Sequence, residues 1–240
     1  HARSYVAGLI NYFLKFFFNF IFIFDIRGFW IEERVDWGLW RRFSFKYIIF
    51  KLFEKKIFNQ SNVIITLTND AKKIIENRYL KKNYSNKVQV IPTCTSIIDN
   101  LNKNKNLVPI FTHLGSIGTR YDFKFFLSFM SEINKRNKSF LSIINKNEHE
   151  KIKKYFFEYK EENLNYSLKY IEPSKIINQI IESDFGVFFP VPGFYLNAYF
   201  PTKLGEFLSA GTPVITSNIN QHVDSIIISN NVGIVINTKE

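Results

Sequence analysis

The stretch FPTKLGEFLSAGTPVIT, residues 200–216, predicts a helix that is followed at once by a buried strand. Pro201 suits the first turn of the helix, where its missing N–H is no loss, and Gly211 suits the position just beyond the helix C-terminus. Lys203 conflicts with this pattern, because a cation in the first turn opposes the helix macrodipole. We therefore interpret Lys203, together with Glu206 one turn later on the same helix face, as a candidate ligand-binding pair.

Short apolar strands alternate with helices on both sides of this stretch. Segments such as FIFIFDI, NVIITL and DFGVFF are continuously apolar, which is typical of parallel strands covered by helices on both faces. The polar run SIIDNLNKNKNL lacks periodicity and indicates a linker. We expect an α/β protein with two doubly wound, Rossmann-like domains, the first incomplete at its start. The expected parts are residues 1–97, a linker at 98–107, and residues 108–240.

The helices that we expect share an apolar stripe at helical spacing between turn-forming residues. Besides the helix that opens at Pro201, they cover residues 5–18, 43–59, 70–79, 121–136, 148–160, 173–183 and 221–228.

The charge balance of the chain favours an anionic partner. The 240 residues include 32 Lys and Arg against 21 Asp and Glu, a net charge of +11, which suits a polyanion, an anionic membrane or a phosphorylated ligand. The lysines are spread along the chain, which favours a compositional bias over a nucleic-acid surface, and no nucleic acid is expected as partner. Cys94 is the single cysteine, which excludes an intrachain disulfide and a thiolate metal cluster and fits a cytoplasmic protein.

An aromatic run near the start, LINYFLKFFFNFIFIF at residues 9–24, resembles a membrane segment at first sight. It is shorter than the ~20 residues that a spanning helix needs, and Asn11, Lys15 and Asn19 interrupt it. No small-residue cleavage site follows, which disfavours a signal peptide. We interpret the run as an amphipathic helix followed by a buried strand, with the helix in peripheral contact with the inner membrane face.

A second candidate constellation is THLGSIGTRYDF, residues 112–123, which predicts a strand, a glycine-containing turn and the start of a helix. Gly115, Ser116 and Gly118 let the backbone approach a ligand at a helix N-terminus, where anions are favoured. Arg120 adds a bidentate phosphate contact. The spacing is neither GxGxxG nor a Walker loop, so an ordinary strand-to-helix turn is the alternative.

Lys203 and Glu206 offer complementary chemistry to one ligand. Lys203 and the free N–H groups of the helix start would hold an anion, and Glu206 would accept two hydrogen bonds from a diol such as a ribose. The alternative is a helical salt bridge on a solvated face, worth roughly a few tenths of a kcal/mol.

Several segments together resemble one family. FPTKLGEFLSAGTPVIT is similar to the donor-binding signature of family 4 glycosyltransferases, which have the two-domain GT-B fold. NVIITLTNDAKKII with VQVIPTC resembles the end of that family's N-terminal domain, THLGSIGTRYDF the glycine loop of its C-terminal domain, and SDFGVFFP the strand before the donor site. HARSYVAGLI and FIFDIRGFWIEERVDWG resemble segments that line the family's interdomain cleft. These segments occur in the family's order over nearly the whole chain.

The resemblance implies a retaining, metal-independent enzyme of the hexosyltransferase type that acts in polysaccharide biosynthesis. It would use a nucleotide-sugar as substrate, need no cofactor, and transfer the sugar to a surface-glycan or lipid-linked acceptor. Glu206 would bind the ribose, Lys203 the diphosphate and Arg120 a phosphate, while the strand end at Tyr170 would lie near the base and the loop Pro192–Phe200 over the sugar. The donor-binding residues would be Gly115, Ser116, Gly118, Arg120, Tyr170, Asn197, Thr202, Lys203 and Glu206.

The chain departs from the family at two positions. The family often has a second glutamate eight positions before the ribose-binding one, where this chain has Ala198, so Asn197 or a backbone N–H would contact the sugar. Arg27 takes the place of a cleft histidine and can stabilise negative charge but not act as a base. Asp25 and His1 complete the candidate catalytic set with Arg27.

These departures keep alternatives open. The first is a catalytically degenerate GT-B domain that binds nucleotide or glycan as a regulatory or assembly partner. Another GT-B enzyme, such as a nucleotide-sugar epimerase, is the second, and a nucleic-acid binder ranks last. No metal is expected, because the histidines are scattered along the chain and no paired metal-ligand spacing accompanies them. They are His1, His113, His149 and His222.

Overall fold

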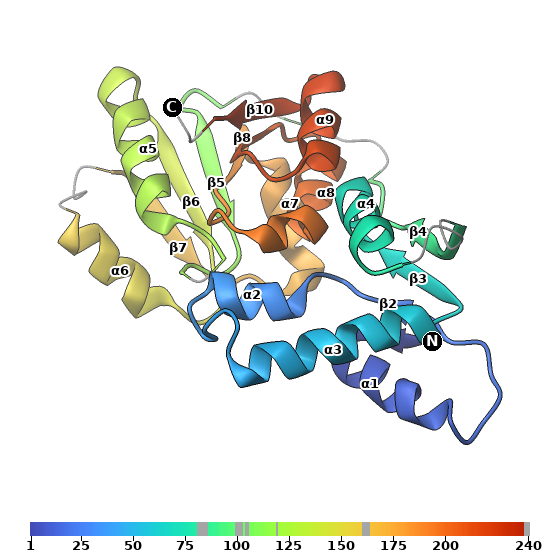
Figure 1. Cartoon of the computed structure of the whole chain (residues 1–240). Helices are drawn as coiled ribbons and strands as arrows, with labels where there is room; N and C mark the ends of the chain where they lie inside the picture. Colours follow the sequence, from blue (N-terminus) through green and yellow to red (C-terminus); the bar gives the residue numbers. More distant parts are fainter. Residues whose placement is uncertain (81–85, 99–102, 104–105, 119, 160–163, 238–240) are drawn as a thin grey trace. The chain divides into compact units, whose positions relative to one another are not determined.

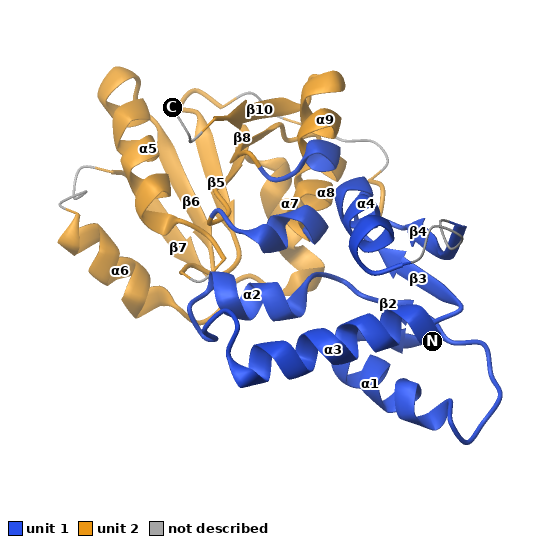
Figure 2. Cartoon of the chain, viewed as in Figure 1, with its two compact units in different colours: residues 1–93, 192–200, 219–223 blue, residues 94–191, 201–218, 224–240 orange. Residues whose placement is uncertain are grey.

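The chain forms two compact units, each built on its own parallel sheet (Figures 1 and 2). The structure is a computed structural model that describes residues 1–80, 86–98, 103, 106–118, 120–159 and 164–237. Unit 1 comprises His1–Thr93, Pro192–Phe200 and Ile219–Val223, and unit 2 comprises Cys94–Val191, Pro201–Asn218 and Asp224–Glu240. The predicted α/β class with two Rossmann-like sheets is confirmed. Most of the predicted linker, residues 99–102 and 104–105, lies outside the described residues.

Unit 1 contains a four-stranded parallel sheet with its strands in sequence order. The strands are β1 (Ala2–Arg3), β2 (Ile23–Asp25), β3 (Val63–Thr66) and β4 (Val88–Val90). The helices are α1 (Ser4–Leu14), α2 (Trp30–Asp36), α3 (Phe45–Gln60) and α4 (Asn69–Arg78), joined by the 3-10 segment η3 (Phe194–Ala198). Of these elements, β1, α2 and η3 were not among the expected ones.

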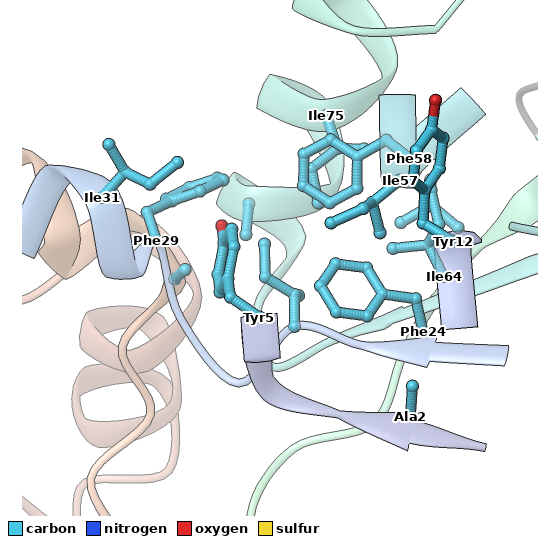
Figure 3. Packing of buried hydrophobic residues seen from close by; sticks show 14 of the residues in the cluster. Ala2, Tyr5, Tyr12, Phe24, Phe29, Ile31, Ile57, Phe58, Ile64 and Ile75 are labelled. Carbon is cyan, nitrogen blue, oxygen red and sulfur yellow. The ribbon is translucent and has the colours of Figure 1, made fainter. Parts of the chain in front are cut away.

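The core of unit 1 is rich in aromatic side chains (Figure 3). Phe24 on β2 is fully buried, with the ring of Tyr5 edge-on at 5.7 Å and the ring of Phe58 at 5.8 Å between centroids. A Cβ on Gly8 would come within 2.6 Å of the Phe24 ring, so glycine allows α1 to lie close to the sheet. Burial of these large rings supplies much of the hydrophobic stabilisation of the unit.

Unit 2 contains a six-stranded parallel sheet of the order β10-β9-β8-β5-β6-β7. The strands are β5 (Ile110–Leu114), β6 (Phe140–Ile144), β7 (Tyr166–Lys169), β8 (Phe185–Phe188), β9 (Val214–Ser217) and β10 (Gly233–Ile236). Counted from β5, this is the 3-2-1-4-5-6 order of doubly wound folds. The order reverses between β5 and β8, and ligands of such sheets bind beyond the carboxyl ends of the strands at that point.

The helices of this half follow the predicted alternation. They are α5 (Phe123–Arg136), α6 (His149–Glu158), α7 (Ile176–Ile181) after the 3-10 turn η2 (Pro173–Lys175), α8 (Thr202–Ser209) and α9 (Gln221–Ser229). A Cβ on Gly186 of β8 would come within 2.5 Å of the Phe207 ring, so this glycine lets α8 pack directly on the sheet. Gly211 has φ +62, as expected for the residue beyond the helix C-terminus. Among the described residues, no helix is long and apolar enough to cross a membrane.

Candidate functional site

Lys203, in the first turn of α8, is a buried cation. The residue is 7% exposed, and its Nζ lies 3.6 Å from the ring centroid of Tyr121 and 5.5 Å from that of Phe188. Within the described residues, Nζ has no hydrogen-bond partner. Burial lowers the pKa of Lys203, against the opposing effects of Tyr121 and Glu206. The ammonium therefore lies against ring faces, although a buried polar group normally requires a hydrogen-bonded partner.

The glycine loop after β5 lies beside this ammonium. Gly115 has φ +107 and Gly118 has φ +101, in the left-handed region that favours glycine. A Cβ on Gly115 would lie 3.4 Å from Lys203 Nζ, so the loop and the lysine are neighbours. Ser116 is exposed, and Arg120 is exposed with its backbone C=O accepting from Val191 N at 3.0 Å. Thr119 lies outside the described residues.

Three polar residues that sequence reasoning missed shape this loop. Asn145, at the end of β6, donates to Gly115 O at 3.0 Å and to Glu148 Oε2 at 3.0 Å. Glu148 Oε2 in turn accepts from the N–H of Ile117 at 2.8 Å. The available signal was the polar Asn145 and Glu148 directly after an apolar strand. The loop is thus held in place by hydrogen bonds from a neighbouring strand end, which is what a pre-formed binding loop requires.

His113, the third of these residues, lies buried beneath the loop. Its Nδ1 is 3.2 Å from Val187 O and its Nε2 is 3.5 Å from Ser116 O. Burial, and then the nearby charge of Lys203, lower the pKa of His113 to about 3. The imidazole is therefore neutral at ordinary pH, and it supports the loop beside Lys203 without adding a second charge.

Glu206 lies one turn after Lys203 and is half-buried. Burial raises the pKa of its carboxyl, and Lys203 partly offsets this. Among the described residues, Lys203 Nζ has no hydrogen-bond partner, so Glu206 does not form with it the solvated salt bridge that was the alternative. Thr202, which precedes them, is exposed. Lys203 and Glu206 thus lie one turn apart on α8 without an ion pair between them.

A separate pocket of about 480 Å³ opens where β7 ends. Tyr170, predicted to lie near a base, is 51% exposed and forms part of its wall. The remaining lining residues come from the same turn and from α7: Ile171, Glu172, Lys175, Asn178, Gln179 and Glu182. The pocket lies at the carboxyl end of the sheet in unit 2, like the glycine loop.

The residues predicted as catalytic lie in unit 1. Asp25 ends β2 and is 8% exposed; its Oδ2 lies 3.9 Å from His1 Nε2 and 3.9 Å from Arg3 Nε, while its Oδ1 has no hydrogen-bond partner among the described residues. Arg3 was not predicted. Arg27 has φ +56, an uncommon conformation for a residue with a side chain. The structure therefore brings His1 and Asp25 together, and no ion pair among the described residues joins Arg27 to them.

The loop Pro192–Phe200 is anchored on unit 1. Asp36 Oδ2 accepts from Tyr195 N at 2.9 Å, and a Cβ on Gly193 would lie only 2.8 Å from that oxygen. Asn220 donates to the backbone at Leu196 and Tyr199 at 2.7 and 2.8 Å. Asp36 lies 159 positions from Tyr195 in the sequence, so no local sequence pattern could predict this hydrogen bond. The shape of this loop is set by long-range hydrogen bonds.

Two predicted positions lie on this loop. Asn197 uses its side-chain amide to donate to Phe194 O at 2.7 Å, and its own C=O accepts from the Thr68 hydroxyl. Ala198, where the family often has a glutamate, is fully buried in the apolar core of unit 1. In the described residues, no cluster of three or more His, Cys, Asp or Glu side chains could hold a metal ion.

Comparison with known proteins finds one family match, in the C-terminal part of the chain. Residues 127–240 match the family described as "Glucosyltransferase 3-like, C-terminal domain". No curated protein matches the chain. Among solved structures, a sucrose-phosphate synthase from Thermosynechococcus elongatus is similar with a TM-score of 0.71 and 14% identity, over 99% of this chain and 60% of that one.

Two further structures are similar. WaaG, a glycosyltransferase involved in lipopolysaccharide biosynthesis, matches with a TM-score of 0.65 and 16% identity over 90% of this chain and 61% of its own. The pneumococcal O-GlcNAc transferase GtfA, in complex with UDP and GlcNAc, matches with a TM-score of 0.55 and 14% identity over 79% of this chain and 37% of its own. The chain thus spans about three fifths of the length of the first two structures.

Proposed function

We propose that the protein is a retaining glycosyltransferase, because residues 127–240 match a Gtf3-like C-terminal domain and the chain has the fold of GT-B glycosyltransferases. It would take a sugar from a nucleotide-sugar donor and pass it to a surface-glycan or lipid-linked acceptor in polysaccharide biosynthesis. We propose the cytoplasm as its location.

The observation that carries the proposal is the unpartnered ammonium of Lys203. A buried charge without a partner is unfavourable in the ligand-free protein. It becomes favourable when an anion occupies the space between Lys203, the glycine loop and the first turn of α8, because all three offer positive charge or N–H groups. The diphosphate of a nucleotide is an anion of this kind.

The other groups of unit 2 suit the rest of a nucleotide. Glu206 would accept hydrogen bonds from the ribose diol, since its carboxylate is half-buried and forms no ion pair with Lys203. The pocket beside Tyr170 would receive the base against an aromatic ring. We take UDP as the first nucleotide to test, because GtfA binds it in the structure compared above.

The proposed chemistry needs no metal. As the bond from the sugar to the diphosphate breaks, negative charge develops on the leaving oxygen, and the sugar gains oxocarbenium character. Lys203 and the N–H groups of the α8 start would stabilise that charge in a site with little water. In unit 1, we assign Asp25, His1 and Arg27 to the acceptor.

Calorimetric titration of UDP, GDP and ADP tests the donor site. We expect one of the three to bind, and Lys203→Met to weaken it about 100-fold, because a charge-assisted contact to a phosphate is lost. Glu206→Ala should weaken the nucleotide as well. Lys153→Met is the matched control, since Lys153 is exposed and paired with Glu150 at 2.8 Å.

Sugar transfer is measured next with nucleotide-sugars of the base that binds, and the anomeric configuration of the product decides between retention and inversion. Binding of all three nucleotides with equal affinity in wild type and in Lys203→Met would refute the site.

A second candidate, a degenerate GT-B domain with a regulatory role, is favoured by the burial of Ala198 in the core. Nucleotide binding without turnover of any sugar donor would support it.

A further inference from the structure

Helix α6 begins beside the glycine loop and is bonded to it. The helix follows β6, which pairs with β5 in the sheet of unit 2 (Figure 1). Asn145, at the end of β6, donates to Gly115 O at 3.0 Å and accepts from the N–H of Glu148 at 2.7 Å. Glu148, directly before α6, accepts from the N–H of Ile117 at 2.8 Å. The first turn of α6 is therefore tied to the loop that Lys203 approaches from α8.

Lys151, in this first turn, places its ammonium against the loop. A Cβ on Gly118 would lie 2.9 Å from Lys151 Nζ. Gly118 has φ +101, and without a Cβ it leaves its backbone open on the side of the ammonium. Lys203 Nζ lies near Gly115, three positions earlier in the same loop. Two ammonium groups thus lie against two glycines of one loop.

The other two lysines of α6 have carboxylate partners. Lys153 Nζ lies 2.8 Å from Glu150 Oε1, and Lys154 Nζ lies 3.5 Å from Glu158 Oε1. Among the described residues, no ion pair joins Lys151 to a carboxylate. A cation in the first turn also opposes the helix macrodipole, which is the same conflict as in the first turn of α8. An anion bound at the loop would remove both unfavourable features.

Glu148 lies three positions before Lys151, which is the spacing of a helical ion pair. Its Oε2 accepts instead from Ile117 N at 2.8 Å and from Asn145 Nδ2 at 3.0 Å. The carboxylate thus shapes the loop, and the exposed ammonium of Lys151 remains beside Gly118 for a ligand.

We propose that Lys151 is a further donor-binding residue, which contacts the diphosphate of a nucleoside diphosphate sugar at Gly118. The inference rests on the function proposed above and adds a second cation to its donor site. Lys203 would hold the same diphosphate near Gly115, and each ammonium would form charge-assisted hydrogen bonds to phosphate oxygens. Both cations would also stabilise the negative charge that develops on the diphosphate as it leaves the sugar.

Calorimetric titration of UDP, GDP and ADP into the full chain and its variants tests the role of Lys151. Lys151→Met should weaken the nucleotide that binds by about tenfold, less than Lys203→Met, because the contact is exposed to solvent. Lys151→Arg keeps the charge and should retain most of the affinity. Lys153→Met and Lys154→Met remove cations from the same helix and are the matched controls.

Two further measurements separate a phosphate contact from a structural role. The nucleoside without phosphates, measured by competition, should bind wild type and Lys151→Met equally. Urea denaturation should show equal stability of the two proteins, since Lys151 has no ion pair to lose among the described residues. Weaker binding of the nucleoside, or a loss of stability in Lys151→Met, would overturn the proposal.

The titrations distinguish failure of this inference from failure of the donor site. Unchanged nucleotide affinity in Lys151→Met, with weaker binding in Lys203→Met, would overturn the role of Lys151 alone. Absence of binding of all three nucleotides to the wild type would overturn the donor site and this inference with it. Equal losses of affinity in Lys151→Met and Lys153→Met would assign the effect to the general charge of α6 and would also overturn the proposal.

Discussion

Two lysines, the partly buried Lys51 and the buried Lys203, show how differently this molecule treats a cation that is shielded from solvent. Lys51 on α3 has partners on several sides: the carboxylate of Glu54, Glu32 Oε1 at 3.2 Å and the hydroxyl of Tyr79. Lys203 on α8 has the ring of Tyr121 and no hydrogen-bond partner among the described residues. Lys51 thus belongs to a complete network, while Lys203 lacks an anion.

The network around Lys51 extends to other polar groups. Tyr5 donates to Glu54 at 2.6 Å and Tyr47 to Glu32 at 3.1 Å. Burial, together with the nearby Glu32 carboxylate, raises the pKa of Tyr47 to about 12, so its hydroxyl stays protonated and keeps donating. A satisfied network of this kind holds a fold together. A buried charge left without a counterpart lowers stability, and proteins keep such groups where function needs them.

The largest expected effect comes from removing the charge at the complete site. Lys51→Met should lower the free energy of unfolding by about 3–5 kcal/mol, because Glu32 and Glu54 remain buried without their cation. Urea denaturation measures this loss. Lys46→Met, at an exposed position on the same helix, should change stability by about 0.5 kcal/mol or less. Equal stability of the two variants would show that the network contributes nothing.

Acid should destabilise the fold through His113, which lies beneath the glycine loop near Lys203. Its pKa is about 3 in the folded chain and about 6.5 when unfolded, so between these values the unfolded chain binds the extra proton. The contribution of His113 to the free energy of unfolding is complete above pH 6.5 and is lost as the pH falls toward 3. By pH 4.5 we expect a loss of about 2–3 kcal/mol that His113→Asn does not show. Parallel pH profiles of unfolding free energy in the two proteins would rule this out.

A smaller effect is expected at Asp36, an anion whose partners are backbone N–H groups. Asp36→Ala leaves the N–H of Tyr195 without its acceptor and should lower stability by about 1–2 kcal/mol. Asp36→Asn retains an oxygen that can accept this hydrogen bond and should therefore lose less stability than Asp36→Ala. Hydrogen exchange at Tyr195 reports the loop directly: faster exchange in Asp36→Ala than in Asp36→Asn is expected, and unchanged exchange in both would show that another group holds the loop.

Local patterns in the sequence predicted most of the fold, and the reason lies in what those patterns encode. Apolar runs such as NVIITL and the turn residues around them fix strands and helices locally, and Thr68 caps α4 by accepting from Ala71 N at 3.1 Å. The seven residues of α2 and the 3-10 segment η3 were missed because elements this short depend on tertiary contacts. The conflict between a cation and the helix dipole singled out Lys203 as a candidate for binding an anion.

The supporting groups of the site were harder to foresee. The carboxylate of Glu148 accepts a hydrogen bond from a backbone N–H that is 31 positions away in the sequence. Asp36 accepts one from a backbone N–H that is 159 positions away. The packing of strands and helices determines such long-range hydrogen-bond partners, and a single sequence contains no periodic signal for them. The neutral state of His113 has the same origin, since it depends on complete burial and on the charge of Lys203.

Thermal unfolding of wild type and Lys203→Met, each with and without saturating UDP, tests most directly whether Lys203 is reserved for an anion. Without UDP, the variant should melt about 2–4 °C higher than the wild type, because a buried unpaired charge has been removed. UDP should raise the melting temperature of the wild type and leave the variant unchanged. A variant that melts lower without UDP, and that UDP stabilises as much as the wild type, would contradict this role for Lys203.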